Sequence, residues 1–358
     1  MRIRTCIVAL IIAVTIYCAV ALAASDGASA DRPNIVWIIA EDASPHIGCY
    51  GETTIRTPHL DQLAKEGVKF THAFVTSPVC SPSRSAMVSG MYPTTLGAHN
   101  HRSQVTTDKG KGNRLYYDSF RLPETIQLIP ELLAQAGYFV VNGGAGKDDY
   151  DKEDYNFVHD KLYRGKHWTD RAEGQPFFAQ IQLHGGKNRG VKVANPVSPA
   201  AVTLPPYYAD DPVLRTDWAQ YLNSWIASDN DVGTIIDQLR DEGVLDNTVV
   251  FFWTDHGISH LRGKQFLYDE GIHVPLIVRF PRGERAGTLR DDLVMQIDVA
   301  ATSLDLAGIP IPQYVQGKSI FSPDYRPREE VFSARDRCDE TVDTIRSVRT
   351  PKFKYILN

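Results

Sequence analysis

Short apolar runs rich in β-branched and aromatic residues alternate with amphipathic segments along most of this chain. Residues 34–40 (Asn-Ile-Val-Trp-Ile-Ile-Ala) form one such run, and their unbroken hydrophobicity is typical of a strand buried on both faces of a sheet. In segment 125–137 the apolar residues recur at helical spacing until Gly137. The alternation predicts an α/β fold with a large, mostly parallel central sheet flanked by helices.

The same patterns give the expected elements and their limits. We expect strands at 34–40, 69–75, 138–142, 176–183, 248–253 and 274–280, and helices at 59–66, 125–137, 217–242 and 298–307. The character changes after residue 325, where strands at 330–333, 344–348 and 352–357 predict a small C-terminal antiparallel sheet. We therefore divide the chain into a leader (1–23), a main α/β domain (24–325) and the start of a small C-terminal subdomain (326–358).

The first 23 residues are typical of a secretory signal peptide. Arg2 and Arg4 precede an apolar run at 6–20, and small residues at 21–23 form a cleavage site. A membrane anchor is the alternative, but the apolar run is short for a membrane span. We expect an exported protein, periplasmic or secreted, without a stable membrane anchor.

Charge and cysteine content narrow the class of protein. The chain has 43 acidic and 38 basic residues, and two of the basic ones belong to the leader. No basic field suggests nucleic acid as a partner, so an anionic substrate must be held by local charge. The cysteines beyond the leader are Cys49, Cys80 and Cys338, an odd number that argues against a disulfide scaffold.

Polar residues follow several of the expected strands directly. In open α/β sheets, ligands bind outside the carboxyl ends of the strands, so these residues are expected to meet at one site. The residues are Glu41 and Asp42 after 34–40, Lys147 after 138–142, His184 after 176–183, and Asp255 and His256 after 248–253.

The two acidic positions indicate a divalent cation. Glu41 and Asp42 are adjacent carboxylates that repel each other unless a cation neutralises them, and hard oxygen ligands suit Ca²⁺ or Mg²⁺. Asp255 supplies a further acid with His256 beside it. The alternatives are a solvated loop acid with a helix cap for the first pair, and a tight turn for the second.

Residues 80–90 (Cys-Ser-Pro-Ser-Arg-Ser-Ala-Met-Val-Ser-Gly) combine a cysteine with an expected helix start. Proline is favoured in the first helical turn, where free backbone N–H groups and the helix dipole attract an anion. Arg84 adds a fixed charge whose planar fork matches an oxyanion. The alternative is a buried structural cysteine at a helix start.

This segment resembles the signature of the formylglycine-dependent (type I) sulfatases of the alkaline phosphatase superfamily, Cys-x-Pro-Ser-Arg. Segment 97–103 and the Glu-Asp pair are most similar to the sulfamidase (N-sulfoglucosamine sulfohydrolase) branch. The resemblance extends from Arg32 to about Tyr355. It implies an alkaline-phosphatase-like fold, with 24–325 as the catalytic domain.

The resemblance also implies roles for individual residues. One divalent metal, Ca²⁺ first and Mg²⁺ as the alternative, would be bound by Glu41, Asp42, Cys80, Asp255 and His256. The catalytic residues would be Cys80, Arg84, Lys147, His184 and Lys264. A formylglycine-generating maturation enzyme would oxidise Cys80 to formylglycine, whose hydrate attacks sulfur.

Two positions depart from the family pattern. Glu41 stands where the family usually has Asp, and Asp149 stands where a histidine usually follows the lysine by two residues. His99 or His101 are candidates to supply that histidine. The departures keep open a non-catalytic protein that binds sulfated glycans with the same fold.

The expected function is that of an exported sulfatase that hydrolyses sulfate esters or N-sulfate groups of a sulfated carbohydrate. The alternative enzyme is a phosphonate monoester or phosphodiester hydrolase of the same superfamily, which uses the same signature and metal.

Overall fold

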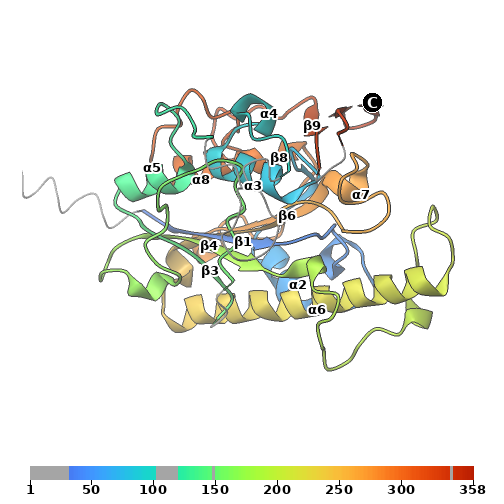
Figure 1. The fold of residues 1–358 in the computed structure, drawn as a ribbon. Helices are drawn as coiled ribbons and strands as arrows, with labels where there is room; N and C mark the ends of the chain where they lie inside the picture. Colours follow the sequence, from blue (N-terminus) through green and yellow to red (C-terminus); the bar gives the residue numbers. More distant parts are fainter. Residues whose placement is uncertain (1–31, 102–119, 147–149, 339–341) are drawn as a thin grey trace, which may run out of the picture.

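The computed structural model describes residues 32–101, 120–146, 150–338 and 342–358. Helices cover both faces of a central sheet: α2 and α6 lie on one face, and α3, α5 and α8 on the other (Figure 1). The helices are α2 (Pro58–Lys65), α3 (Cys80–Ser89), α4 (Pro93–Leu96), α5 (Ile129–Gln135), α6 (Pro212–Asp241), α7 (Asp269–Ile272) and α8 (Gln296–Leu306). The short 3₁₀ turns are η1 (Gly48–Tyr50), η2 (Trp168–Asp170), η3 (Gly185–Lys187), η4 (Pro199–Ala201), η5 (Leu245–Asn247) and η6 (Pro281–Gly283).

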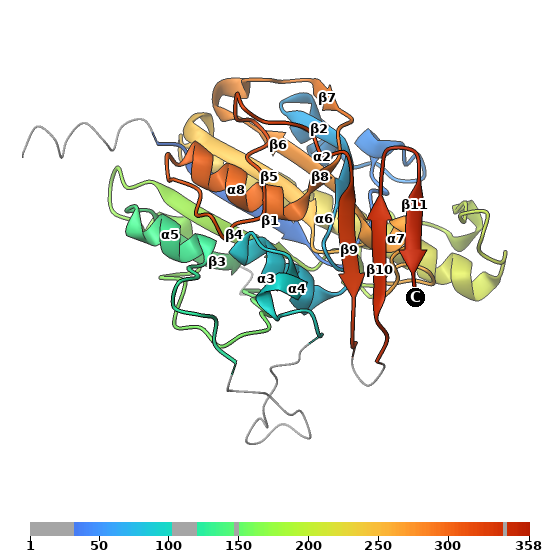
Figure 2. The ribbon, with the colours of Figure 1, turned by 90° about the horizontal axis from the view of Figure 1, so that it is seen from above.

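The central sheet has eight strands in the order β3-β4-β1-β5-β6-β2-β7, with β8 beside β2 (Figure 2). β6 runs antiparallel to β5 and β2, whereas the other pairs are parallel, so the predicted mostly parallel sheet is confirmed. The strands are β1 (Asn34–Ala40), β2 (Val68–Phe74), β3 (Phe139–Gly144), β4 (Phe177–Leu183), β5 (Thr248–Thr254), β6 (His273–Arg279), β7 (Thr288–Arg290) and β8 (Val294–Met295).

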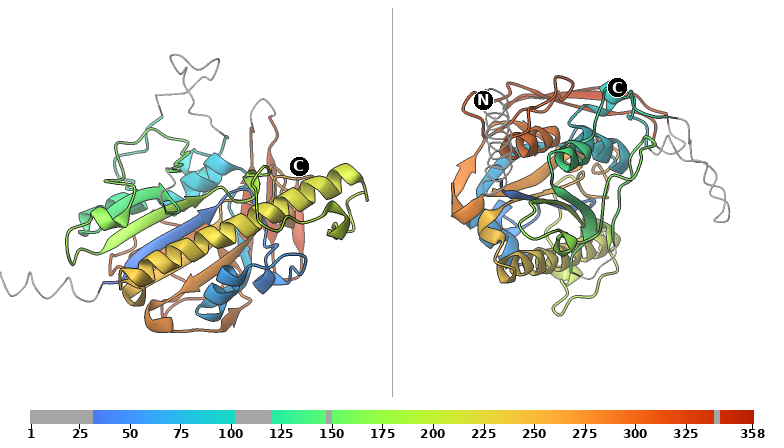
Figure 3. Two further views of the ribbon diagram at one scale, coloured as in Figure 1. Left: turned by 90° about the horizontal axis from the view of Figure 1, so that it is seen from below. Right: turned by 90° about the vertical axis from the view of Figure 1, so that its left-hand side faces the viewer.

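Hydrophobic clusters on the two faces of the sheet form the core. All seven residues of β1 are buried, which explains why the strand reads as an unbroken apolar run. Trp37 points into the cluster beneath α8 and packs edge to face against Phe178 and Trp253, with ring centroids 4.9 and 5.3 Å apart. The opposite face is covered along its length by α6, as Figure 3 shows.

The C-terminal strands form the predicted separate antiparallel sheet. β9 (Val331–Arg335), β10 (Ile345–Arg349) and β11 (Lys354–Leu357) pair in the order β11-β10-β9. This sheet is attached to the main body by hydrogen bonds, including Ala334 N to Thr76 O at 2.9 Å. Asp269 at the start of α7 adds an ion pair with Lys354 at 2.9 Å.

Some expected limits differ from the structure for local reasons. The helix expected at 125–137 is the shorter α5, because Pro130 favours a start at the first turn and the chain before it is extended. α6 begins earlier than expected, at Pro212, where the Asp211 side chain accepts a hydrogen bond from Val213 N and caps the helix. β7 and β8 were not expected, because strands of three and two residues give no periodic pattern.

Three further sequence expectations concern export and cysteines. The signal peptide expected at 1–23 lies outside the described residues. Within the described ranges, no helix is both long and apolar enough to span a bilayer. Cys49, Cys80 and Cys338 are free thiols.

Asp229 of α6 provides a test of how the two helices on one face are joined. Its buried carboxylate accepts hydrogen bonds from the N–H groups of His59 and Leu60, at 3.3 and 2.8 Å, in the first turn of α2. We expect Asp229→Ala to lower the free energy of unfolding by about 1–2 kcal/mol, because two backbone donors of the first turn of α2, one of them buried, lose their acceptor. Urea denaturation at neutral pH measures this change. The neighbouring exposed residue gives the control, and an equal loss in Asn230→Ala would contradict the prediction.

Candidate active site

The residues that follow three adjacent strands lie together at the carboxyl ends of those strands. In the register of β1, Ala40 pairs with Leu183 of β4 and with Thr254 of β5. The next residues along these strands are Glu41, His184 and Asp255. The expected convergence at the carboxyl ends of the strands is therefore set by parallel pairing.

A buried four-residue cluster lies at these strand ends. The potential ligand atoms of Asp42, Cys80, Asp255 and His256 all lie within 4.8 Å of one another. His256 Nε2 lies 3.1 Å from Cys80 Sγ and 3.1 Å from Asp42 Oδ1. These are four of the five residues that the sequence assigns to the metal.

The donor set of this cluster fits a divalent cation. Asp42 and Asp255 are buried side by side, and a positive charge is needed between two such carboxylates. Charged groups of the protein supply it here, because Lys264 Nζ lies 2.9 Å from Asp42 Oδ2 and the pKa of His256 is raised. Burial lowers the pKa of His256, but Asp255, Cys80 and Asp42 outweigh it. An oxygen in place of the sulfur at position 80 suits a hard cation better than a thiol does.

Glu41, the fifth predicted ligand, has different partners in the structure. Its fully buried carboxylate accepts hydrogen bonds from Lys152 Nζ at 2.6 Å and Lys187 Nζ at 3.3 Å. Its other oxygen lies 3.8 Å from Nη2 of Arg84. Glu41 thus gathers three cations beside the four-residue cluster, and its role as a metal ligand stays a prediction.

Helix α3 begins at Cys80, as the sequence pattern predicts, and all ten of its residues are buried. The pKa of the Cys80 thiol is lowered to about 6. Burial raises this pKa, but the charge of His256 and hydrogen bonds from His101 and His256 outweigh burial. Position 80 therefore favours a negatively charged or strongly polarised group.

Arg84 is a fully buried cation with one unused donor. Its Nε donates to Asp255 Oδ2 at 3.1 Å, and its Nη1 donates to Gln182 Oε1 at 2.8 Å. Burial lowers the pKa of Arg84, but the carboxylates of Asp255 and Glu41 raise it by more. The guanidinium therefore stays charged. Its buried Nη2 makes no hydrogen bond within the described part of the chain. A buried donor without a partner is what an oxyanion in this site would use.

Lys264 closes the cluster on its more accessible side. Besides Asp42, its Nζ contacts Cys80 Sγ at 3.3 Å, and its side chain is 21% exposed. The loop that carries it is fixed by backbone hydrogen bonds, from Lys264 N to Ile258 O at 2.7 Å and from Gln265 N to Pro78 O at 2.9 Å. The predicted catalytic lysine thus touches the predicted nucleophile position.

His184 directly follows β4 and stacks on Tyr150, with ring centroids 4.1 Å apart. The two glycines that follow it explain its position. A Cβ at Gly185 would lie 2.3 Å from Glu41 O, and one at Gly186 would lie 2.2 Å from Asp42 O. Only glycine allows the chain after β4 to pass this close to the backbone of the acidic pair.

Lys147, with Asp149, lies outside the described residues, so its role stays a prediction. Lys152, five residues further on, is a site cation that the sequence analysis missed, because the charged run around it reads as a solvated loop. His101 was noted only as a substitute histidine, and it belongs beside the site because it helps to lower the pKa of Cys80. Its backbone N–H donates to Arg337 O at 2.9 Å, which joins its turn to the segment after β9.

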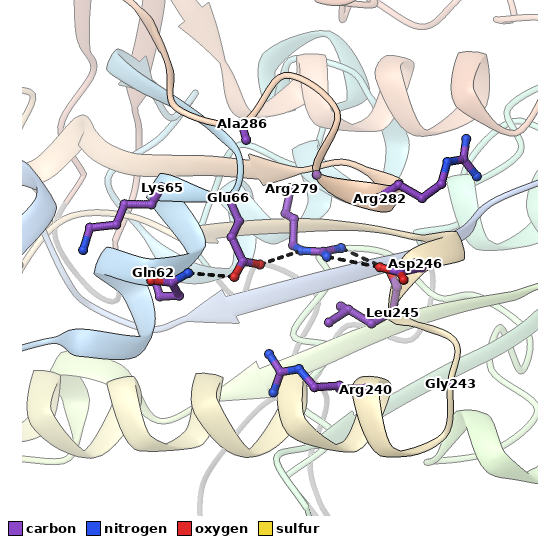
Figure 4. A pocket seen from close by; sticks show the side chains of 11 residues that line it. Gln62, Lys65, Glu66, Arg240, Gly243, Leu245, Asp246, Arg279, Arg282 and Ala286 are labelled. Atoms are coloured by element: carbon purple, nitrogen blue, oxygen red, sulfur yellow. Dashed lines mark hydrogen bonds and ion pairs between the residues drawn. The ribbon is translucent and has the colours of Figure 1, made fainter.

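A cavity of about 600 Å³ lies near the other end of the central strands, between the C-terminal ends of α2 and α6 (Figure 4). Its central arginine, Arg279, pairs with Glu66 at 3.0 Å and with Asp246 at 3.7 Å. The predicted site residues do not line this cavity. Its ion pairs connect the segments that follow α2 and precede β5 to the end of β6, so we interpret them as structural.

Comparison with known proteins identifies the class. The Sulfatase family pattern matches residues 33–309, so the chain belongs to the sulfatase family. It is 34% identical to an ulvan-active sulfatase of Formosa agariphila, over 92% of this chain and 61% of that protein. It is 28% identical to human N-sulphoglucosamine sulphohydrolase, over 79% of this chain and 62% of that protein. The chain thus spans about three-fifths of the length of these relatives.

Solved structures support the fold. The phosphonate monoester hydrolase of Agrobacterium radiobacter aligns with a TM-score of 0.74 at 16% identity, over 91% of this chain and 87% of that one. BT4656 in complex with its substrate D-glucosamine-2-N,6-O-disulfate aligns with a TM-score of 0.66 at 18% identity, over 91% and 88%. The alkaline-phosphatase-like fold predicted from the sequence is confirmed, as is the resemblance to sulfatases.

The lowered pKa of Cys80 gives a prediction for metal-free protein that retains the thiol. We expect thiolate absorbance in the ultraviolet to rise through a midpoint near pH 6, well below the usual Cys value of about 8.5. Cys80→Ser should remove this transition. A transition that persists in Cys80→Ser, or one that occurs only near the usual value, would contradict the assignment.

Proposed function

We propose that this protein is an exported sulfatase that removes sulfate from a sulfated carbohydrate, through a formylglycine hydrate at position 80 and one divalent metal, Ca²⁺ in the first instance. The sulfate is carried as an O-ester or an N-sulfate. The maturation of Cys80 requires a formylglycine-generating enzyme as partner. Export rests on the expected signal peptide.

The observation that carries the proposal is the position of Cys80 among opposite charges at a helix start. Two carboxylates, Asp42 and Asp255, lie within 4.8 Å of its sulfur position. Arg84, with its unused buried donor, lies one turn further along the same helix. A nucleophile, a metal-ligand set and an anion-binding arginine in one buried group are the parts that sulfuryl transfer requires.

The residues divide the chemistry among themselves. A hydroxyl of the hydrated aldehyde at position 80 would lose its proton to solvent and form a bond to sulfur, while the bond from sulfur to the sugar oxygen or nitrogen breaks. His184, which directly follows β4, donates the proton that the leaving group needs. Arg84 and Lys264 stabilise the charge on the transferring group. The second hydroxyl then gives its proton to solvent and becomes the aldehyde oxygen, while the C–O bond to the sulfate ester breaks and sulfate departs. Addition of water restores the hydrate.

The metal would be held by Asp42, Asp255, His256 and the oxygens of position 80, with Glu41 as the further predicted ligand. When bound, it lowers the pKa of the hydroxyl at position 80 and withdraws charge from the sulfate. Lys147 is proposed as an additional sulfate contact.

Turnover tests this proposal directly. Protein co-produced with a formylglycine-generating enzyme should release sulfate from an aryl sulfate and from N-sulfated glucosamine or ulvan oligosaccharides. We expect Cys80→Ala to reduce turnover about a thousandfold or more, since it removes the nucleophile. Chelation should abolish turnover, and added Ca²⁺ should restore it.

Cys49→Ala, which removes a thiol outside the site, is the matched control and should keep its turnover. Mass spectrometry of the peptide across position 80 distinguishes formylglycine from cysteine. An unmodified thiol without turnover would favour the sulfated-glycan binding protein. Faster hydrolysis of aryl phosphonates or phosphodiesters than of aryl sulfates would favour the phosphonate hydrolase.

A further inference from the structure

A group of large side chains stands exposed beside the candidate active site. We name Tyr207, Arg262, Phe266 and Tyr268 the aromatic ledge. The three rings are 47%, 46% and 40% exposed. Aromatic residues usually bury most of their surface, and gathered exposed rings are typical of a binding surface.

Arg262 holds the ledge together. Its guanidinium lies 4.0 Å from the ring centroid of Tyr268 and 5.1 Å from that of Tyr207. Phe266 lies next to Tyr268 with the rings nearly parallel, the centroids 6.3 Å apart and the planes at 25°. Among the described residues, no carboxylate lies within ion-pair distance of Arg262. The nearest acid at the ledge is Glu270, which accepts a hydrogen bond from the Tyr207 hydroxyl. The ledge thus presents a cation that is not held in a direct ion pair.

The loop that carries Arg262, Phe266 and Tyr268 has an energetically unfavourable backbone conformation. Arg262 has φ 63° and Gln265 has φ 75°, both in the left-handed region that non-glycine residues rarely adopt. A Cβ at Gly263 would lie 2.1 Å from Ile258 O, so the loop folds tightly on itself. The Tyr208 hydroxyl also donates to Leu261 O. The ring positions are therefore set before any ligand arrives.

The ledge and the active site share one loop. Lys264, whose Nζ contacts Cys80 Sγ, lies between Arg262 and Phe266 in the same loop. Two residues of chain span at most about 7 Å, so the ledge lies close to the residue that closes the cluster. A saccharide with its sulfate among Arg84 and Lys264 would reach the ledge with an adjoining sugar unit.

We propose that the aromatic ledge binds a second, anionic sugar unit of the substrate, so that the enzyme acts on saccharides longer than one unit. The C–H face of the ring packs on Tyr268 or Phe266, and its carboxylate or sulfate pairs with Arg262. This proposal rests on the proposed sulfatase function.

The test compares a large and a small substrate. With an ulvan-derived sulfated tetrasaccharide, Arg262→Gln and Tyr268→Leu should each raise KM about tenfold with kcat nearly unchanged. With 4-nitrophenyl sulfate, which is too short to reach the ledge, kcat/KM should stay within about twofold of the wild type. A carboxyl-reduced tetrasaccharide identifies the paired anion: loss of the Arg262 effect indicates a carboxylate, and its persistence indicates a sulfate.

Arg285→Gln is the matched control. Arg285 also has a positive φ and lies over two aromatic rings, Phe280 and Phe321, but it follows β6 at the far edge of the sheet. It should leave KM for both substrates unchanged. If the ledge variants also leave KM for the tetrasaccharide unchanged while the wild type turns over, the ledge proposal is wrong.

A binding measurement separates this outcome from failure of the proposed function. If the wild type hydrolyses neither substrate, the sulfatase proposal is wrong, and calorimetric titration of the tetrasaccharide still tests the ledge. Weaker binding by Arg262→Gln than by wild type and Arg285→Gln supports the ledge. Equal binding by all three overturns it.

Discussion

The balance of buried charges at the carboxyl ends of the central strands constrains this structure more than any other interaction. Glu41, Asp42 and Asp255 are carboxylates with almost no exposed surface at the end of the sheet. Arg84, also buried, lies between Asp255 and Glu41, so removing any one of these charges leaves the others uncompensated. Such an arrangement costs free energy of folding and is retained where function needs it.

The backbone around these charges is arranged to bring them together. Parallel pairing of β1 with β4 and β5 aligns the three strand ends, and two glycines after His184 let that chain pass against the acidic pair. Helix α3 begins at the site, with Cys80 at its first position. Rigid elements therefore fix the relative positions of the proposed nucleophile, the acids and the cations. The loop around Lys264 carries both the contact with Cys80 and the aromatic ledge.

Much of the fold and of the site could be predicted from the sequence, since both depend on local signals. Strand β1 matches the expected range because a strand buried on both faces is a continuous apolar run. The Cys-x-Pro-Ser-Arg segment predicted the start of α3 and placed Cys80 and Arg84 one turn apart on it. Short strands such as β7, and Lys152 in a charged run, carry no comparable signal, because distant partners determine their positions.

The sequence by itself determined which residue types are available and which strand ends present them, because periodicity and short motifs are properties of neighbouring residues. Only the tertiary structure decided that Glu41 faces Lys152 and Lys187, whereas Asp42 faces Cys80. Adjacent residues at a strand end point in different directions, and their partners come from separate segments between 38 and 222 positions away. Chain folding in three dimensions makes those choices, and no local pattern records them.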